Sequence, residues 1–439
     1  MKRGAALVVV SLAVSGTAHA QGRAMPIEEC VSVAIARNPD SLSADFEVDA
    51  AEAGRTGVRG ELLPKLRAEG NLQEWNKPFN LPFALAPGQP PANFPVRDQL
   101  TWGFTATVTQ PLTGLFNTLD RYKVERVGVD VARLKRDATR RDLGFNVAET
   151  YLRLLEAMRL DEVAKTSITQ LEAQRKQAQS LLANGVVGKN DELRAELALA
   201  NAKQREIQAR GQVLLMRGRL AVLMGMPPDA PIEPMPFADE PPPATDDGTL
   251  EASQSRAVSE RIEVRAVAQR IDQEEARVSA ARSKLLPQVS GVGAYVHSEG
   301  SVFNLKDSAY VGAVASWDVW DWGTTTSGID AAAARREQAK LAKTKLEDDV
   351  RLEARQAFVD LQTAREAFAV AKTALEQAEE NYRIVTKRFE QAAGTSFDVV
   401  DAESLLTTAR AQVENAKYGL LVTRLSLQRA TGAMMPRVR

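Results

Sequence analysis

Residues 100–110 read LTWGFTATVTQ, and this stretch decides the fold. Its apolar side chains recur at every second position: Leu100, Trp102, Phe104, Ala106 and Val108. The positions between them carry glycine or threonine. Strict alternation of this kind predicts a β-strand with one apolar and one polar face. A strand that crosses an outer membrane has this pattern, and so does a half-buried strand of a soluble sheet.

Three other segments are predicted to be strands. Residues 65–75 are the expected partner of strand 100–111, with a polar face made of Arg67, Glu69, Asn71 and Gln73. Two more strands are expected at about 288–297 and 309–320. Trp317, Trp320 and Trp322 lie near the end of the last strand, where a transmembrane barrel carries its aromatic girdle. Proline disfavours a helical residue before it, so helices should stop ahead of Pro64 and Pro287.

Four strands are too few to close a barrel, since the smallest transmembrane barrels have about eight. An open sheet edge in lipid leaves backbone groups unsatisfied at a cost of several kcal/mol each. If these strands cross a membrane, other copies of the chain must therefore complete the wall, and three copies would supply about twelve strands. The outer face of that barrel would carry Leu100, Trp102, Phe104 and Trp317.

The chain repeats itself. Residues 191–196 align with residues 398–403, and the same spacing of 207 positions pairs Gly225 with Gly432. Upstream, Leu62-Leu63-Pro64 aligns with Leu285-Leu286-Pro287 at a spacing of 223. The extra 16 residues of the first copy fit the loop at 77–96, rich in Pro, Phe and Asn. This pattern indicates a tandem duplication.

Long helices are predicted in both copies, because apolar residues alternate at spacings of three and four. A helix from about 329 to 392 would be about 95 Å long. Each copy should form an antiparallel hairpin that turns near Gly185 or Gly394. The seam residues are Ala354, Ala357, Leu361, Ala364, Phe368, Ala371, Leu375, Ala378, Tyr382, Val385 and Phe389, then Val399, Ala402, Leu406, Ala409, Val413, Ala416, Leu420, Thr423, Leu427 and Ala430. An ordinary cytoskeletal-type coiled coil would share the seam, but it would lack the strands.

The first twenty residues resemble a secretory signal, with Lys2 and Arg3 before an apolar core and Ala18-His19-Ala20 as a cleavage site. No later segment reaches the roughly 18 apolar residues of a membrane-spanning helix. Lys plus Arg number 56 and Asp plus Glu 57, which gives no electrostatic argument for nucleic acid. An exported protein that is periplasmic, secreted or in the outer membrane is expected.

The residues of enzyme sites are scarce. Beyond the expected cleavage site the chain has one histidine, His297, which excludes a multi-histidine metal site. Its one cysteine, Cys30, can form no internal disulfide and is expected to be a small buried residue of the first helix. Without a phosphate-cradling glycine loop either, the sequence predicts no enzyme and no cofactor.

The duplicated strand-pair and hairpin pattern, the Leu-Leu-Pro helix ends, Thr109-Gln110-Pro111-Leu112 and residues 398–402 together resemble the TolC-like outer-membrane efflux protein family, over about 26–432. The resemblance implies a mainly α-helical chain with four barrel strands, which assembles as a homotrimer with a twelve-stranded barrel and a helical tunnel. It implies an outer-membrane exit duct that meets a periplasmic adaptor protein and an inner-membrane transporter of the RND, ABC or MFS type. The alternative is a soluble periplasmic coiled-coil adaptor or scaffold. The cargo, whether drug, metal, small molecule or protein, stays open.

The resemblance also implies functional residues at the two helical turns. Acidic residues ring the periplasmic entrance in the family, and Asp398 and Asp401 match them, with Asp191 as the first-copy counterpart and Phe389 as an aromatic gate partner. The alternative is that acids in a first helical turn only complement the helix dipole. Adaptor contact would use Asn184-Gly185-Val186 and Gly394, although residues 391–394 depart from the family pattern. Gly394 could equally serve as a turn residue with positive φ.

The expected organisation follows from these features. A signal peptide occupies 1–20, and the first repeat occupies 21–225. A Pro-rich segment at 226–250 is expected to surround the tunnel at an equatorial level, together with both termini. The second repeat occupies 251–432, and a tail follows at 433–439.

Overall fold

The computed structural model describes residues 24–83, 88, 90–236, 248–391 and 393–436, so the expected signal peptide lies outside the described residues, as do parts of the Pro-rich segment and the tail. Within the described ranges, no helix has the length and apolar content that a bilayer span requires. The chain forms two compact units. Unit 1 comprises residues 1–38, 146–243 and 364–422, and unit 2 comprises residues 39–145, 244–363 and 423–439. Each unit therefore draws on both sequence repeats.

The long helices are α3 (Gly114–Ala183), α4 (Lys189–Leu223), α7 (Thr324–Glu390) and α8 (Ser396–Ala430). The predicted seams are confirmed, because every seam residue in α7 and α8 is buried or half-buried. In unit 1, α3 packs on α4 through the buried residues Leu171, Leu199 and Ala202. Small alanines at the seam let helices approach closely, so the packing is dense without large side chains.

Unit 1 also contains α1 (Ile27–Arg37) and a short parallel pairing of β1 (Ala24–Met25) with β5 (Glu233–Pro234). Tyr151 of α3 anchors this pairing. Its hydroxyl lies 2.9 Å from the carbonyl oxygens of Met25 and Met235 and accepts from the Met235 amide at 2.8 Å. Burial raises the pKa of the Tyr151 phenol, which therefore stays neutral and can bond both strands.

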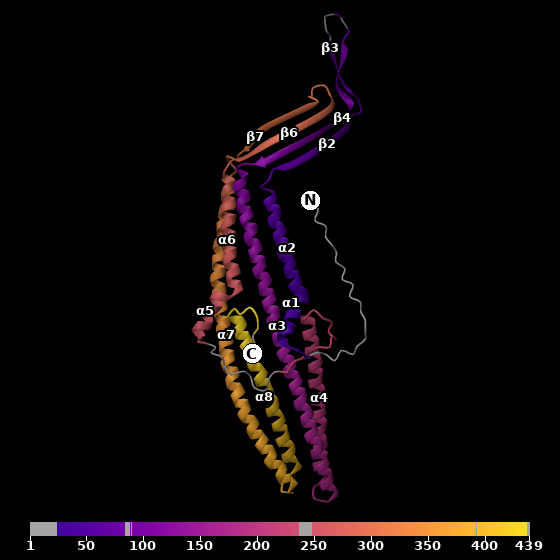
Figure 1. Cartoon of the computed structure of the whole chain (residues 1–439), viewed down its shortest axis with the longest axis vertical. Helices are drawn as coiled ribbons and strands as arrows, with labels where there is room; N and C mark the ends of the chain where they lie inside the picture. The colour runs from indigo at the N-terminus through magenta and orange to yellow at the C-terminus, as the bar shows by residue number, and fades with distance from the viewer. Residues whose placement is uncertain (1–23, 84–87, 89, 237–247, 392, 437–439) are drawn as a thin grey trace. The chain divides into compact units, whose positions relative to one another are not determined.

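Unit 2 contains α2 (Pro39–Gly60), α5 (Leu250–Glu260), α6 (Ile262–Arg282) and an antiparallel sheet. A single 3₁₀ turn, Ser283–Leu285, follows α6 before Pro287. The sheet order is β2 (Lys65–Glu74), β4 (Ala92–Pro111), β6 (Gln288–Ser301) and β7 (Asp307–Ser316), as Figure 1 shows. Its free edges are β2 and β7.

The strands differ in extent from the prediction. β4 begins at Ala92, because β3 (Phe79–Phe83) pairs with its first residues and turns the expected loop at 77–96 into a hairpin extension. The described part of that hairpin excludes residues 84–87 and 89. β7 ends at Ser316, opposite Gln288, and not at Trp320. Pro287 has no amide hydrogen to continue the ladder, so the expected strand residues 317–320 lie outside the sheet.

The duplication recurs in the geometry. Asn38 separates α1 from α2 with φ −65° and ψ 131°, and Arg261 separates α5 from α6 with φ −66° and ψ 132°. Both Gly225 and Gly432 have positive φ. A Cβ atom on Gly225 would lie 2.7 Å from the Arg37 carbonyl oxygen, and one on Gly432 would lie 2.9 Å from Glu260 Cβ. Each second hairpin helix thus ends against the break between two shorter helices, where only glycine fits.

Candidate functional site

The register of the sheet decides which side chains share a face, because directly opposite residues in antiparallel strands point the same way. Leu66 is opposite Val108, Val108 is opposite Gly293, and Gly293 is opposite Val311. One row therefore crosses all four strands on the face of Trp102. The apolar residues of that face are Leu66, Ala68, Leu72, Leu100, Trp102, Phe104, Ala106, Val108, Val289, Tyr295, Ala309, Val311, Ala313 and Ala315. Its polar residues lie toward the strand ends: Glu74, Gln110, His297, Glu299 and Asp307. We call this face the apolar face, and its Val311 is 93% exposed.

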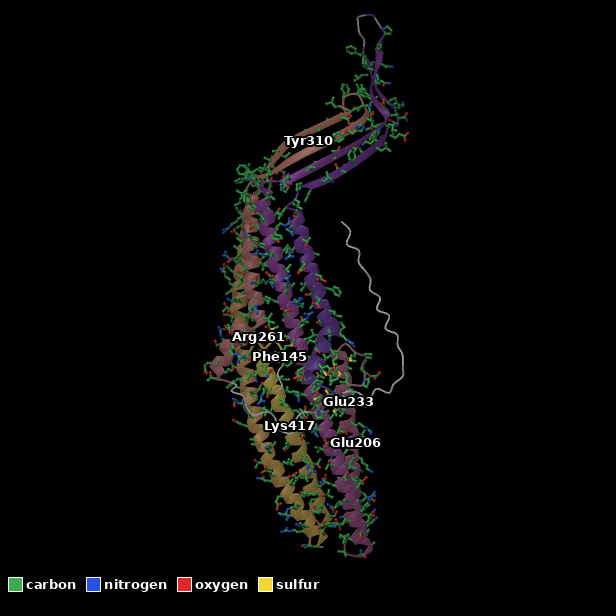
Figure 2. The ribbon with its side chains drawn as sticks, viewed as in Figure 1. Phe145, Glu206, Glu233, Arg261, Tyr310 and Lys417 are labelled. Atoms are coloured by element: carbon green, nitrogen blue, oxygen red, sulfur yellow. The ribbon has the colours of Figure 1, made fainter. Side chains whose placement is uncertain are left out.

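The opposite face is polar in the first copy. Thr101, Thr105 and Thr107 lie opposite Gln73, Glu69 and Arg67, as the alternation predicts. The second-copy strands contribute a mixture to this face: Ser290, Val292, Ala294, Val296, Ser298, Ser308, Tyr310, Gly312, Val314 and Ser316. Tyr310 of β7 is labelled in Figure 2 and is 58% exposed. The contrast between the two faces is therefore sharpest on β2 and β4.

Polar groups bound the apolar face at the end where β6 turns into β7. Tyr295 donates to Asp307 at 2.5 Å, and His297 Nδ1 lies 2.8 Å from the same carboxylate. The Trp102 ring stacks at 4.8 Å from His297. An apolar band that ends in aromatic and polar side chains is typical of a strand that leaves lipid for water.

The opposite end of the band carries tryptophans that follow β7. Trp317 donates its indole N–H to the Leu285 carbonyl at 3.2 Å, and Trp320 and Trp322 meet edge to face at 5.8 Å. Trp317, expected on the outer face of a strand, lies just after the strand instead. Leu100, Trp102 and Phe104 lie together on the apolar face and are more than 40% exposed.

The first helical turn of unit 1 joins α3 to α4. Gly185 has φ 71°, its amide donates to Leu182 at 3.0 Å, and the Val186 amide donates to Leu181 at 2.9 Å. This pattern of two backbone bonds around a left-handed glycine closes a helix C-terminus. The Asn184 side chain bonds Ser180, and Val186 is left 51% exposed at the turn. The turn thus exposes the Val186 side chain on a backbone held by hydrogen bonds.

The second turn joins α7 to α8, and Gly394 in it corrects one expectation, because its φ is not positive. Glycine suits this position because it has no side chain: a Cβ atom there would lie 3.3 Å from the Phe389 amide nitrogen. Phe389 itself is 1% exposed. The ring expected to be a gate partner is therefore packed in the seam.

Asp398 caps α8. Its carboxylate accepts from the Thr395 amide at 3.1 Å and from the Thr395 hydroxyl at 2.7 Å. The same hydroxyl lies 3.3 Å from the Asp398 amide, which makes a reciprocal capping box. These bonds lower the pKa of Asp398. Asp401, one turn on, is exposed, with no hydrogen bond or ion pair to the described residues.

Asp191 has the same place in the first copy, where its carboxylate accepts from the Gly188 amide at 3.3 Å. Its carbonyl accepts from the Ser396 hydroxyl at 3.3 Å, so the starts of α4 and α8 touch within unit 1. The structure thus brings Asp191 and Asp398 to neighbouring helix starts. Sequence reasoning missed Thr395 and Ser396, although a Thr three residues before an Asp is a recognisable capping signal.

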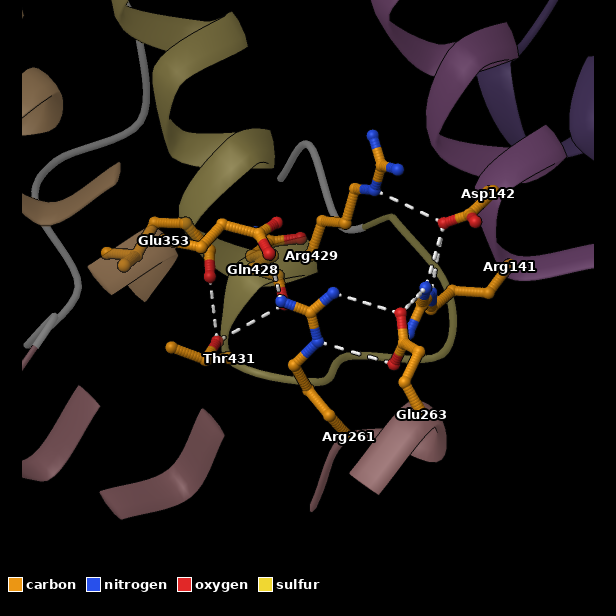
Figure 3. A network of polar contacts seen from close by, with 9 residues as sticks. Arg141, Asp142, Arg261, Glu263, Glu353, Gln428, Arg429 and Thr431 are labelled. Atoms are coloured by element: carbon orange, nitrogen blue, oxygen red, sulfur yellow. Dashed lines mark hydrogen bonds and ion pairs between the residues drawn. The ribbon is translucent and has the colours of Figure 1, made fainter. Parts of the chain in front are cut away.

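An ion-pair network around two buried arginines of unit 2 was also missed (Figure 3). Arg141 of α3, 1% exposed, donates to both oxygens of Glu263 of α6 at 2.6 and 3.0 Å. Arg261 bonds the same carboxylate at 2.9 Å and also pairs with Glu353 of α7. Burial raises the pKa of Glu263, but the bonds from Arg141 and Arg261 outweigh it and hold that pKa well below its usual range. Arg141 and Glu263 lie 122 positions apart in the sequence, and no local sequence pattern predicts their pairing.

Among the described residues, no group of three or more His, Cys, Asp or Glu side chains is arranged to hold a metal ion. Cys30 is fully buried in α1, as predicted. Burial, with help from Glu29, raises the pKa of its thiol to about 11. A thiol with so little thiolate is a poor nucleophile.

Comparison with known protein families identifies one family. The model of the outer membrane efflux protein family matches residues 30–226 and 254–433, which is most of the chain. No curated protein sequence matches.

Several solved structures have the same fold. The similarity to CusC has a TM-score of 0.80 at 16% identity and covers 96% of this chain and 95% of that one. VceC, an outer membrane protein of Vibrio cholerae, gives 0.76 at 15%, covering 92% and 96%. The MtrE outer membrane channel of Neisseria gonorrhoeae gives 0.75 at 18%, covering 94% and 90%. At such identities the likeness shows the fold alone.

Proposed function

The chain belongs to the outer membrane efflux protein family, and on that premise we propose that three copies assemble into an exit duct fed by a periplasmic adaptor and an inner-membrane pump. The family membership makes it an outer-membrane channel protein. The observation that carries the finer proposal is the sheet register, which gathers the large exposed apolar residues of β2 and β4 on one face.

The topology of the sheet supports an assembly of more than one copy. The free edges of the sheet are β2 and β7, and every pairing along β2, β4, β6 and β7 is antiparallel. β2 and β7 therefore run in opposite directions, so β7 of one copy can pair antiparallel with β2 of the next. Three copies give a closed wall of about twelve strands with no edge in lipid.

The helical tips would form the entrance. Asp191 and Asp398 mark neighbouring helix starts, and Asp401 adds an exposed carboxylate one turn further on. In three copies these acids would form a negatively charged ring at a narrow entrance, which binds cations and lets multivalent cations block the passage. Phe389 would support the ring from behind as a packed seam residue.

The adaptor would bind at the turns. Val186 offers an exposed aliphatic side chain on a backbone fixed by Gly185, with Asn184 beside it. Gly394 lets the second turn pack tightly against Phe389, so that turn offers backbone in place of a side chain. A partner that inserts small apolar side chains between the turns would fit both.

The experiment measures the membrane fraction that contains the intact protein, the mass of the assembled particle and its conductance. The duct predicts fractionation with outer membranes, a detergent-extracted particle with the mass of three chains, and single-channel currents in planar bilayers. A soluble periplasmic coiled-coil adaptor, the second candidate, predicts a protein that dissolves without detergent and conducts nothing. A monomer in detergent that gives no current would contradict the duct.

A further inference from the structure

Two neighbouring cavities lie in unit 2 where α6 faces α3 and α7. Their volumes are about 520 Å³ and about 450 Å³. Arg277 of α6 and Arg335 of α7 line both, so the two cavities adjoin. We call the two cavities together the α6–α7 groove.

The groove is rich in basic side chains: Arg121, Arg270, Arg277, Lys284 and Arg335. Glu125 and Glu274 are its acids. Arg121 and Arg277 already have carboxylate partners. Arg270, Lys284 and Arg335 have no ion-pair partner among the residues that the structure describes, so the groove carries uncompensated positive charge.

The two copies of the repeat differ at the first of these charges. In the first copy, Glu47 of α2 pairs with Lys135 of α3 at 2.8 Å. Arg270 occupies the position equivalent to Glu47, and Ala342 occupies the position equivalent to Lys135. The second copy thus has a base where the first has an acid, and a small residue where the first has the partner. The exchange both opens space and leaves a cation without its carboxylate.

The same exchange occurs at the other end of the groove. Glu61 pairs with Arg121 at 2.6 Å in the first copy. The equivalent positions in the second copy hold Lys284 and Gly328, and both line the groove. At both places the first copy has an ion pair and the second copy has a basic residue opposite a small one.

The middle of the groove adds two arginines in place of glycines. Arg277 is equivalent to Gly54 and Arg335 to Gly128. At the groove floor, Glu274 is 4% exposed and accepts from Arg277 at 2.6 Å. This bond holds one end of the Arg277 guanidinium, and the other Glu274 oxygen is buried with no hydrogen-bond partner among the described residues.

We propose that the α6–α7 groove binds a phosphate-bearing anion. A guanidinium presents a planar fork of N–H donors that matches two phosphate oxygens, and Arg270, Arg277 and Arg335 can surround one such group. Lys284 adds a point charge near the start of the sheet. Phosphates reach this site either as the headgroup of an anionic lipid or on a soluble anion. The inference concerns unit 2 alone and does not rest on the duct.

The first arm of the test titrates inorganic pyrophosphate into the full-length, detergent-purified protein by calorimetry. The variant R270Q/R335Q removes two charges that lack partners within the described residues, so its fold should persist. It should bind pyrophosphate at least about tenfold more weakly. The control R265Q/R336Q removes two arginines from the same helices outside the groove lining and should bind like wild type.

The second arm counts bound lipids by native mass spectrometry, with phosphatidylglycerol against phosphatidylcholine of the same chain length. Retention of phosphatidylglycerol that R270Q/R335Q loses and R265Q/R336Q keeps supports a lipid headgroup as the ligand. Pyrophosphate binding without lipid retention supports a soluble anion. Binding of neither, or equal loss in the groove variant and the control, overturns the proposal whether or not the protein conducts.

Discussion

Arg141 and Glu263 form a bidentate ion pair, 2.6 and 3.0 Å long, between α3 and α6 of unit 2. Removing the Glu263 charge leaves a guanidinium that is 1% exposed with Asp142 as its one carboxylate partner among the described residues. We expect Glu263→Gln to lower the free energy of unfolding by about 2–3 kcal/mol, somewhat less than for a fully buried pair because Glu263 is 29% exposed. The measurement is denaturant unfolding followed by circular dichroism. The exposed α2–α3 pair serves as control, where Glu52→Gln should cost less than about 1 kcal/mol.

The same pair predicts a pH dependence. The folded pKa of Glu263 lies below the unfolded carboxyl value of about 4.3, so its stabilisation is complete above that pH and is lost as the pH falls further. The difference in unfolding free energy between wild type and Glu263→Gln should be constant from about pH 7 to about pH 5 and shrink below about pH 4. A difference that is unchanged at about pH 3 would show that the pair does not supply it.

Gly225 should not tolerate a side chain. Alanine there combines a positive φ with a Cβ 2.7 Å from the Arg37 carbonyl oxygen, so Gly225→Ala should lose at least about 2 kcal/mol of stability. Gly432→Ala should behave alike, because its surroundings repeat those of Gly225. Gly57 of α2 has open space around its Cβ position, and Gly57→Ala should be neutral or gain up to about 1 kcal/mol. Thermal unfolding of the three variants compares them, and equal midpoints would refute the packing argument.

Asparagine variants at Asp398 and Asp401 can separate the effect of their charge from the effect of helix capping. Asp398→Asn with Asp401→Asn removes both charges, while the amide oxygen at 398 can still accept from Thr395. If the acids form a gate, this variant should raise single-channel conductance and weaken block by multivalent cations as much as the double alanine variant does. If Asp398 only caps α8, the asparagine variant should conduct like wild type. Planar bilayer recording decides between them.

The helix seams and one strand could be predicted from the sequence, whereas several tertiary contacts could not. Helix seams and the strand at 100–110 were readable because burial follows the periods of 3.6 and 2. The end of β7 was predicted too far along the chain. It depends on Pro287, which directly precedes the partner strand β6. Gly394 was misread because its tight contact with the Phe389 amide is a tertiary fact. The Arg141–Glu263 pair had no local signal, since its two helices meet only in the folded unit.

The central claim is that the apolar face of the sheet contacts lipid and its opposite face contacts water. Single cysteines placed one by one at residues 100–108 in a Cys30→Ala background, each labelled with a fluorophore, test it in reconstituted vesicles. Acyl-brominated lipids should quench positions 104, 106 and 108 strongly and positions 100 and 102 less, because these two lie opposite Glu74 and Glu299 beyond the polar border at His297. Aqueous iodide should quench 101, 103, 105 and 107. Iodide quenching of every position alike, with no effect of brominated lipid, would contradict the account.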